Sequence, residues 1–189
     1  MWYSIQLQIM QLFIIMVSIQ KKPHIIRILG IDPGFGRVGF GIIDCVGDRS
    51  TLVEYGCIET DMKRTFVERL VDISDELIKI IRTHKPNCAA VEELFFYKNV
   101  TTAIKVGQAR GVILLTLTKA HLAVHEYTPL EVKQSITGYG RADKTQLESM
   151  VKVLLGIKKK ITPDDAADAL AIALTCAASR KMEEFSSRS

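Results

Sequence analysis

The fold of this chain is decided around residues 27–34, whose sequence is RILGIDPG. The apolar run at 28–31 predicts a short buried strand, and Pro33 and Gly34 predict a turn directly after it. Asp32 therefore ends a buried strand at the point where the chain must turn. Taken alone, an Asp in this position is most simply explained as a turn-forming residue.

The strands that follow predict a mixed β-sheet. Residues 38–46 and 51–59 are separated by glycine-rich or polar turns, so the first three strands should form an antiparallel meander. Residues 88–92 form a fourth strand that is apolar up to Glu92, as expected for a central strand covered on both faces. A fifth strand is predicted at 123–127.

Helices separate and follow these strands. Apolar spacing and capping residues predict their limits, as in the capping box of Thr65 and Glu68 that opens the first helix. The predicted helices run from Thr65 to before Pro86, over 99–120, from Thr128, over 143–155 and over 163–181. The resulting order of strands and helices resembles the ribonuclease H-like arrangement, an α/β fold with a five-stranded mixed sheet flanked by helices on both faces.

The second helix carries a row of small residues. Ala103, Gly107 and Gly111 are spaced four apart, so they form one stripe without bulk. Because Gly inside a helix costs about 1 kcal/mol, the stripe needs a packing reason. Tight packing within the chain is the favoured explanation, and a seam between two copies is the alternative.

Acidic residues recur where these elements begin and end. Glu92 repeats the strand-end pattern of Asp32, and Asp165 and Asp168 are three apart on the last helix, so their carboxylates share a face. Helix capping after Thr162 would be enough to explain Asp165. Asp168 lies one turn further in, among alanines, where neither helix propensity nor burial favours an acid.

These four carboxylates together predict a divalent cation. Desolvating an ionised carboxylate costs several kcal/mol, so a cluster of them implies a cation that compensates their charge. Mg²⁺ prefers oxygen ligands, and two such ions held by shared carboxylates are the usual means of cutting a phosphodiester bond. The sequence therefore favours a nuclease.

Length and composition suit one globular domain. The chain has 189 residues, with 25 Lys plus Arg against 21 Asp plus Glu, and the formal net charge of +4 is too small to establish a polyanionic partner. The cysteines are far apart in apolar surroundings without a Cys-x-x-Cys pair, so we expect small core residues in a reducing cytoplasmic compartment and no zinc site or disulfide. They are Cys45, Cys57, Cys88 and Cys176.

Residues 1–26 form an atypical apolar leader. Its apolar part, 5–19, is interrupted by polar residues and is shorter than the roughly 20 residues of a membrane-spanning helix. It also lacks the basic start and small-residue cleavage site of a signal peptide. We expect 1–26 to be non-native or disordered, 27–181 to form the nuclease domain without a membrane segment, and 182–189 to be a polar tail.

Four stretches resemble the bacterial RuvC family of Holliday-junction resolvases. They are LGIDPG at 29–34, AVE at 90–92, KVGQARG at 105–111 and DAADALAIA at 165–173. The resemblance covers about residues 27–180, and four motifs in the right order make a chance match implausible.

On this resemblance, the catalytic metal ligands are Asp32, Glu92, Asp165 and Asp168, with Asp32 between two Mg²⁺ ions, for which Mn²⁺ can substitute. One metal activates an attacking water and the other stabilises the leaving 3′ oxygen, which gives a 5′ phosphate and a 3′ hydroxyl. The resemblance also implies a homodimer that makes paired, symmetric nicks in a four-way DNA junction during recombination and repair. A RuvA–RuvB branch-migration complex is the implied partner.

The resemblance further implies DNA-binding residues. Phe95 occupies the place of a family aromatic side chain after the strand-end Glu, where it could stack on an unpaired base. Basic residues are expected near the scissile phosphate and along the DNA backbone. They are Lys133 and Lys144 at the first place and Arg141, Lys98 and Lys105 at the second.

Two departures from the family pattern lie near the expected DNA surface. Phe35 and Gly36 replace small polar and basic residues after Pro-Gly, and Glu93 stands where an amide is common. Neither touches the expected ligands, so they bear on the preferred cleavage sequence more than on activity. Whether Asp164 or Glu93 assists the metal site, and whether the lysines at 158–160 contact DNA, stays open.

Other functions compete with this one. A YqgF-type nuclease acting on ribosomal RNA precursors shares the strand-end Asp32, but the 107–111 helix and the Asp165/Asp168 pair argue against it. An actin-like ATP-binding fold needs a second domain, for which the chain has no room. A non-catalytic junction-binding module would have no use for four acids.

Overall fold

A computed structural model of the chain describes residues 24–93 and 100–186. Its centre is one five-stranded sheet in the order β3-β2-β1-β4-β5. The strands are β1 (Ile26–Asp32), β2 (Arg37–Val46), β3 (Arg49–Glu59), β4 (Cys88–Glu92) and β5 (Ala123–Tyr127). The first three pair antiparallel, whereas β4 pairs parallel to both β1 and β5, so the predicted meander and mixed sheet are confirmed.

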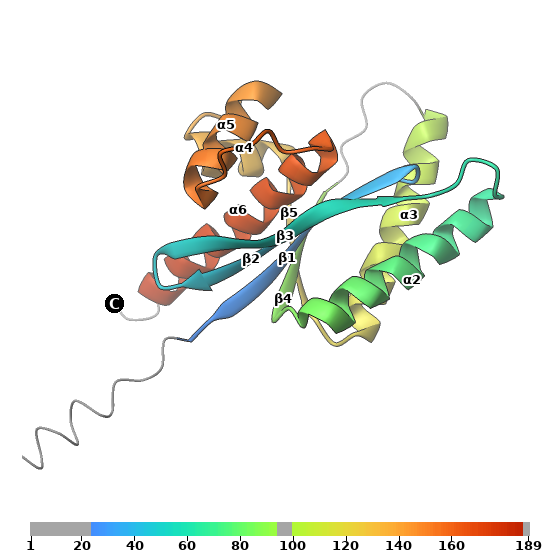
Figure 1. Cartoon of the computed structure of the whole chain (residues 1–189), viewed down its shortest axis with the longest axis horizontal. Coiled ribbons are helices and arrows are strands. Elements are labelled where there is room, and N and C mark those ends of the chain that lie inside the picture. Colours follow the sequence, from blue (N-terminus) through green and yellow to red (C-terminus); the bar gives the residue numbers. More distant parts are fainter. Residues whose placement is uncertain (1–23, 94–99, 187–189) are drawn as a thin grey trace, which may run out of the picture.

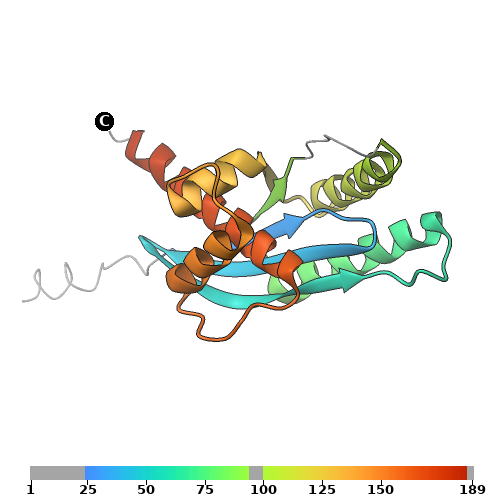
Figure 2. The ribbon, with the colours of Figure 1, turned by 90° about the horizontal axis from the view of Figure 1, so that it is seen from above.

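Helices cover both faces of this sheet, as Figures 1 and 2 show. They are α2 (Phe66–His84), α3 (Val100–Lys119), α4 (Pro129–Thr137), α5 (Lys144–Leu155) and α6 (Asp164–Ser186). Two apolar clusters form the core: one joins α2 and α3 to one face of the sheet, and the other joins α4, α5 and α6 to the opposite face. The alternation Ile28-Leu29 on β1 sends one side chain into each cluster.

Local capping signals fix several helix starts. Thr65 and Glu68 form the predicted capping box at α2, and Thr128 and Glu131 form the same arrangement at α4. The end of α6 differs from the prediction, because the helix continues to Ser186 instead of ending near Lys181.

Glycines in the sheet let α6 approach it closely. A Cβ atom added at Gly30 of β1 would overlap the backbone of Ala169, and one added at Gly39 of β2 would overlap the backbone oxygen of Asp165. The alanine-rich first half of α6 is buried against these glycines. The N-terminal turns of α6 are therefore brought over the ends of β1 and β2.

The two glycines of the small-residue stripe on α3 do not pack inside the chain, whereas Ala103 is buried. A Cβ atom added at Gly107 or Gly111 would meet nothing within 4 Å, and Ile104 and Leu115 beside them are 58% and 54% exposed. The prediction of tight intramolecular packing is wrong at the two glycines, because the apolar face of α3 that meets the sheet carries Ala109 instead. A seam between two copies stays a prediction.

No helix in the described part of the chain combines the length and apolarity that crossing a bilayer requires. Most of the expected leader, residues 1–23, lies outside the described residues.

Candidate active site

Asp32 and Glu92 end two neighbouring parallel strands. The pairing of β1 with β4 places Ile31 opposite Val91, so the next residue on each strand is an acid. Because parallel strands end at the same edge of a sheet, the two carboxylates lie side by side there. The two strand-end acids predicted from separate parts of the sequence therefore come together.

The first turns of α6 bring the other two acids to the same edge. Gly39 is the residue directly opposite Asp32 in the β1–β2 pair, and the backbone of Asp165 lies against it. Asp168 follows one turn later on the same helix. Asp32 interacts electrostatically with Glu92, Asp168 and Asp165, so all four predicted carboxylates share one site.

Burial and mutual repulsion perturb the two strand-end acids. Desolvation, followed by the charges of Glu92, Asp168 and Asp165, raises the pKa of Asp32 to about 8. Desolvation and the charge of Asp168 raise the pKa of Glu92 to about 7. Both carboxyls therefore hold their protons near neutral pH. This indicates that the site has too little positive charge to stabilise their ionised forms.

Two predicted lysines lie at this cluster. Lys144, the first residue of α5, donates a hydrogen bond from Nζ to Asp168 Oδ2 at 2.9 Å. This hydrogen bond, with the negative charges of Asp168, Asp32 and Asp165, raises the pKa of Lys144. Lys133 on α4 lies close enough to Glu92 for its charge to oppose the rise of the pKa of that carboxyl.

Asp165 is the acid whose surroundings differ most from the sequence interpretation. Its Oδ2 lies 3.2 Å from Arg37 Nε, and this ion pair, not helix capping, is its recorded side-chain contact. The geometry falls short of a hydrogen bond, so Oδ2 is a buried oxygen without a hydrogen-bond donor among the described residues. Arg37 was not foreseen, because the sequence gives no sign that β2 begins beneath α6.

This donor set fits hard divalent cations. Carboxylate oxygens are the ligands that Mg²⁺ prefers, one of them is buried without a donor, and two of the acids carry raised pKa values.

Arg110 holds the end of β4 in place. Its Nε donates a hydrogen bond to the backbone oxygen of Glu92 at 3.1 Å, and its Nη2 pairs with the carboxylate of Glu126 on β5. Arg110 lies in the KVGQARG motif, but the sequence alone assigned it no role. The structure makes it a positioning residue for Glu92.

Aromatic and basic side chains from α2 and α3 surround Phe35 in the loop after Asp32. Phe35 meets Phe66 edge-on, with ring centroids 6.1 Å apart, and the guanidinium of Arg69 lies 5.1 Å from the Phe35 ring. Lys105 Nζ lies 5.6 Å from the same ring. Lys105 is thus exposed beside the loop that follows the strand-end acid.

The remaining predicted DNA-binding residues are dispersed. Arg141 is exposed in the loop between α4 and α5, and the lysines at 158–160 are exposed before α6. Phe95 and Lys98 lie outside the described residues. The sequence left open whether Asp164 or Glu93 assists the metal site. Asp164 is exposed, and the backbone N–H of Glu93 donates a hydrogen bond to the backbone oxygen of Tyr127 at 2.8 Å.

A family comparison agrees with this geometry. The family described as crossover junction endodeoxyribonuclease RuvC matches residues 28–176. Those residues include all five strands except the first two residues of β1, and all four acids.

Individual relatives match over most of the chain. A crossover junction endodeoxyribonuclease RuvC of Petrotoga mobilis is 52% identical over 146 residues, which are 77% of this chain and 90% of the relative. One of Caldicellulosiruptor saccharolyticus is 53% identical over 149 residues, 78% of this chain and 90% of the relative. Among solved structures, T. thermophilus RuvC in complex with a Holliday junction substrate matches with a TM-score of 0.79 and 34% identity, covering 84% of this chain and 96% of that one.

Proposed function

The chain belongs to the RuvC family, and from this premise we propose that it is a DNA endonuclease that resolves Holliday junctions. Its reaction is hydrolysis of phosphodiester bonds in two strands of a four-way junction, as a pair of symmetric nicks. The observation that carries the proposal is the meeting of Asp32, Glu92, Asp165 and Asp168 at one edge of the sheet. A solved relative bound to a Holliday junction supports the substrate.

We propose two Mg²⁺ ions, replaceable by Mn²⁺, as the cofactors of this site. Asp32 would ligate both, a role supported by its electrostatic interaction with Glu92, Asp168 and Asp165. When bound, the ions supply a water of lowered pKa and stabilise the leaving 3′ oxygen. Asp32 and Glu92 must release their protons before they can serve as ligands, so metal binding and deprotonation are linked.

Two lysines of the chain, Lys144 and Lys133, complete the site. Lys144 uses one of its three N–H groups on Asp168, which leaves two for a phosphate oxygen of the scissile group. Lys133 contributes a second positive charge near Glu92. Both lysines thus position the phosphate next to the acids and oppose the negative charge that grows on its oxygens.

Contacts farther from the acids position the DNA. We propose that Lys105, Arg141 and Lys98 contact the phosphate backbone, and that Phe95 stacks on a base at the crossover. The edge-on pair of Phe35 and Phe66, with Arg69, shapes the loop beside Lys105.

The partners follow from the paired nicks. Two cuts in two strands need two active sites, so we propose that the working unit is a homodimer. A RuvA–RuvB branch-migration complex would present the junction, and the cytoplasm would be the place of action. We also propose that residues 27–181 form the nuclease domain.

The alternatives make different predictions. The family match favours the junction resolvase over a YqgF-type RNA nuclease. A non-catalytic junction binder would have no need of four acids gathered at one site, of which Asp32 and Glu92 have raised pKa values.

The test uses purified protein with a four-way junction, a linear DNA duplex and an RNA duplex, with and without Mg²⁺. We expect paired nicks on the junction alone, dependent on Mg²⁺. Asp32→Asn should lower the cleavage rate by roughly 1,000-fold or more, because a shared metal ligand is worth several kcal/mol in the transition state. It should still bind the junction. Cleavage of RNA without cleavage of the junction would favour the YqgF-type function.

A further inference from the structure

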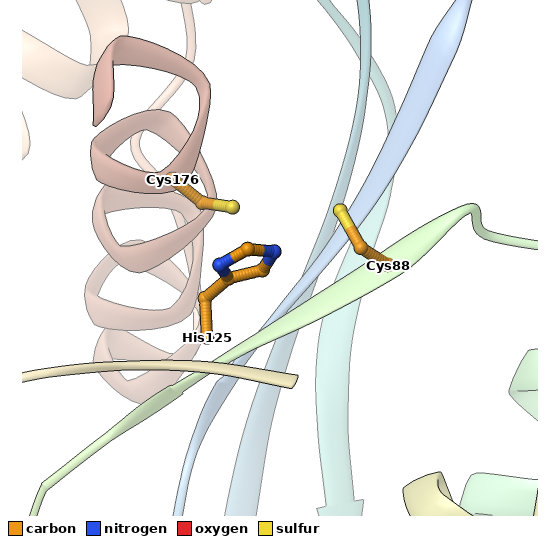
Figure 3. A group of neighbouring side chains, drawn as sticks. All are labelled: Cys88, His125 and Cys176. Atoms are coloured by element: carbon orange, nitrogen blue, oxygen red, sulfur yellow. The ribbon is translucent and has the colours of Figure 1, made fainter. Parts of the chain in front are cut away.

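A second cluster of metal-ligand side chains lies on the same face of the sheet as α6 but at the opposite end from the acids. It consists of Cys88 on β4, His125 on β5 and Cys176 on α6, whose sulfur and ring nitrogen atoms lie within 4.8 Å of one another. Figure 3 shows both sulfur atoms directed toward the imidazole ring, one from the helix and one from the strand. The sequence interpretation treated these cysteines as unrelated core residues.

The strand register explains why these residues meet. Ala90 of β4 is directly opposite His125 of β5, and Cys88 is two residues before Ala90, so Cys88 and His125 share a face of the sheet. Cys176 lies two turns beyond Asp168 on α6, on the part of that helix that packs in the same core cluster as Cys88. Each ligand therefore comes from a different element.

The polar atoms of this cluster are incompletely satisfied. His125 Nε2 is buried and has no hydrogen-bond partner among the described residues. Cys88 and Cys176 are 2% and 0% exposed. A buried nitrogen with a free lone pair or an unpaired N–H is costly, and a metal ion beside two sulfur atoms would give it a partner.

We infer that Cys88, His125 and Cys176 bind one Zn²⁺ ion that ties β4, β5 and α6 together. Thiolate and imidazole are the ligands that zinc prefers, whereas Mg²⁺ prefers oxygen, so the two metal sites of the chain select different ions. Zn–S bonds of about 2.3 Å in a tetrahedral site put two sulfur atoms about 3.8 Å apart. The donor atoms of the three residues already lie within 4.8 Å of one another.

Neighbouring groups suit this occupant. The positive charge of Arg180 acts on both Cys88 and Cys176 and favours their thiolate forms. Two thiolates would neutralise the charge of Zn²⁺. A water would complete the coordination.

The site would be structural. Cys88 begins the strand that ends in Glu92, and Cys176 lies on the helix that carries Asp165 and Asp168. An ion at the far end of these elements would fix their relative positions without contacting DNA. Its effect should therefore appear in stability before it appears in catalysis.

The experiment uses the full chain, reduced, stripped of metal and kept in excess Mg²⁺ so that the acids are occupied. Co²⁺ is added as a spectroscopic probe, followed by Zn²⁺. We expect one equivalent of Co²⁺ to give sulfur-to-cobalt charge-transfer absorption and Zn²⁺ to abolish it. Zinc at about 100-fold over its Kd should raise the melting temperature by roughly 5–10 °C.

Variants separate this site from binding elsewhere. His125→Gln and Cys88→Ser should lose the cobalt absorption and the zinc-dependent rise in melting temperature, whereas Cys57→Ser should keep both. If Cys88→Ser fails to fold, His125→Gln, which changes a half-buried residue, decides the question. The inference is overturned by absent charge-transfer absorption, by zinc binding that survives in His125→Gln, or by a Cys88–Cys176 disulfide that forms under these reducing conditions.

Discussion

Lys144 Nζ lies 2.9 Å from Asp168 Oδ2, so the acid that helix propensity explains least is paired with a base from the start of the preceding helix. Asp168 is 22% exposed and Lys144 is 74% exposed, so the pair joins the buried acids to the solvent. The charge of Lys144 also opposes the rise in the pKa of both Asp32 and Glu92. Lys144 thus acts on the protons of the acids as well as on the substrate.

Replacing Lys144 by Gln should therefore change both rate and pH dependence. We expect the rate of junction cleavage to fall by roughly 100-fold, the size of effect seen when one preorganised donor is removed. Because Lys144 lowers the pKa of Asp32 and Glu92, its loss should move the acid limb of the pH–rate profile to higher pH. Lys159→Gln, at an exposed lysine before α6, is the matched control. An unchanged pH profile would show that Lys144 acts on the phosphate alone.

The raised pKa of Asp32 predicts how the stability of the metal-free protein depends on pH. Its pKa is about 8 in the folded chain and 3.8 ordinarily, so the folded state binds a proton that the unfolded state has lost. Stability from this group is present below about pH 4 and declines as pH rises toward 8. We expect the melting temperature in EDTA to fall across that window, with Glu92 adding to the decline up to about pH 7.

Two comparisons isolate the cause of that decline. Saturating Mg²⁺ should flatten the slope, because the cations favour the ionised carboxylates. Asp32→Asn in EDTA should also flatten it and should melt at a higher temperature than the unaltered chain at pH 8. A variant that melts lower at pH 8 would mean that Asp32 is not a source of repulsion.

Arg110 should matter through Glu92. Arg110→Ala removes the hydrogen bond to the Glu92 backbone and the ion pair with Glu126, so the end of β4 loses its tether. We expect the Mg²⁺ concentration for half-maximal cleavage to rise about 10-fold, the lower end of effects seen when a group behind a metal ligand is removed. Excess Mg²⁺ should restore most of the rate. Arg82→Ala, at an exposed arginine on α2, serves as the control. A loss that Mg²⁺ cannot rescue would instead indicate general damage to the fold.

Gly39 tests the close approach of α6 to the sheet. In Gly39→Ala, the new Cβ would overlap the backbone oxygen of Asp165, so the helix must shift. Overpacking of this kind costs about 1–3 kcal/mol, which corresponds to a loss of roughly 2–12 °C in melting temperature. Gly36→Ala is the matched control, because its Cβ would meet Arg69 Nη2 at an ordinary 3.5 Å. Equal melting temperatures for the two variants would argue that α6 has room to move.

Much of this fold could be predicted because its signals are local. The Thr65–Glu68 and Thr128–Glu131 capping boxes lie within four residues, and the strand ending in Glu92 is a continuous apolar run. The four acids could be grouped because strand ends and a helix face restrict where a carboxylate can lie.

Contacts between distant segments could not be predicted in this way. The partner of Asp165 is Arg37, which lies 128 positions earlier in the chain, and the three ligands of the sulfur cluster come from three elements. Gly107 and Gly111 are a second example of a contact that could not be predicted. Their spacing predicts that they share one face of a helix, but it does not predict which part of the chain packs against that face.

The most direct test of the central claim is anomalous diffraction from crystals of the protein soaked in Mn²⁺. If Asp32, Glu92, Asp165 and Asp168 hold the catalytic ions, two anomalous peaks should appear at the carboxyl edge of β1 and β4, roughly 4 Å apart, with Asp32 bound to both. Absence of peaks there at a Mn²⁺ concentration that supports junction cleavage would contradict the account.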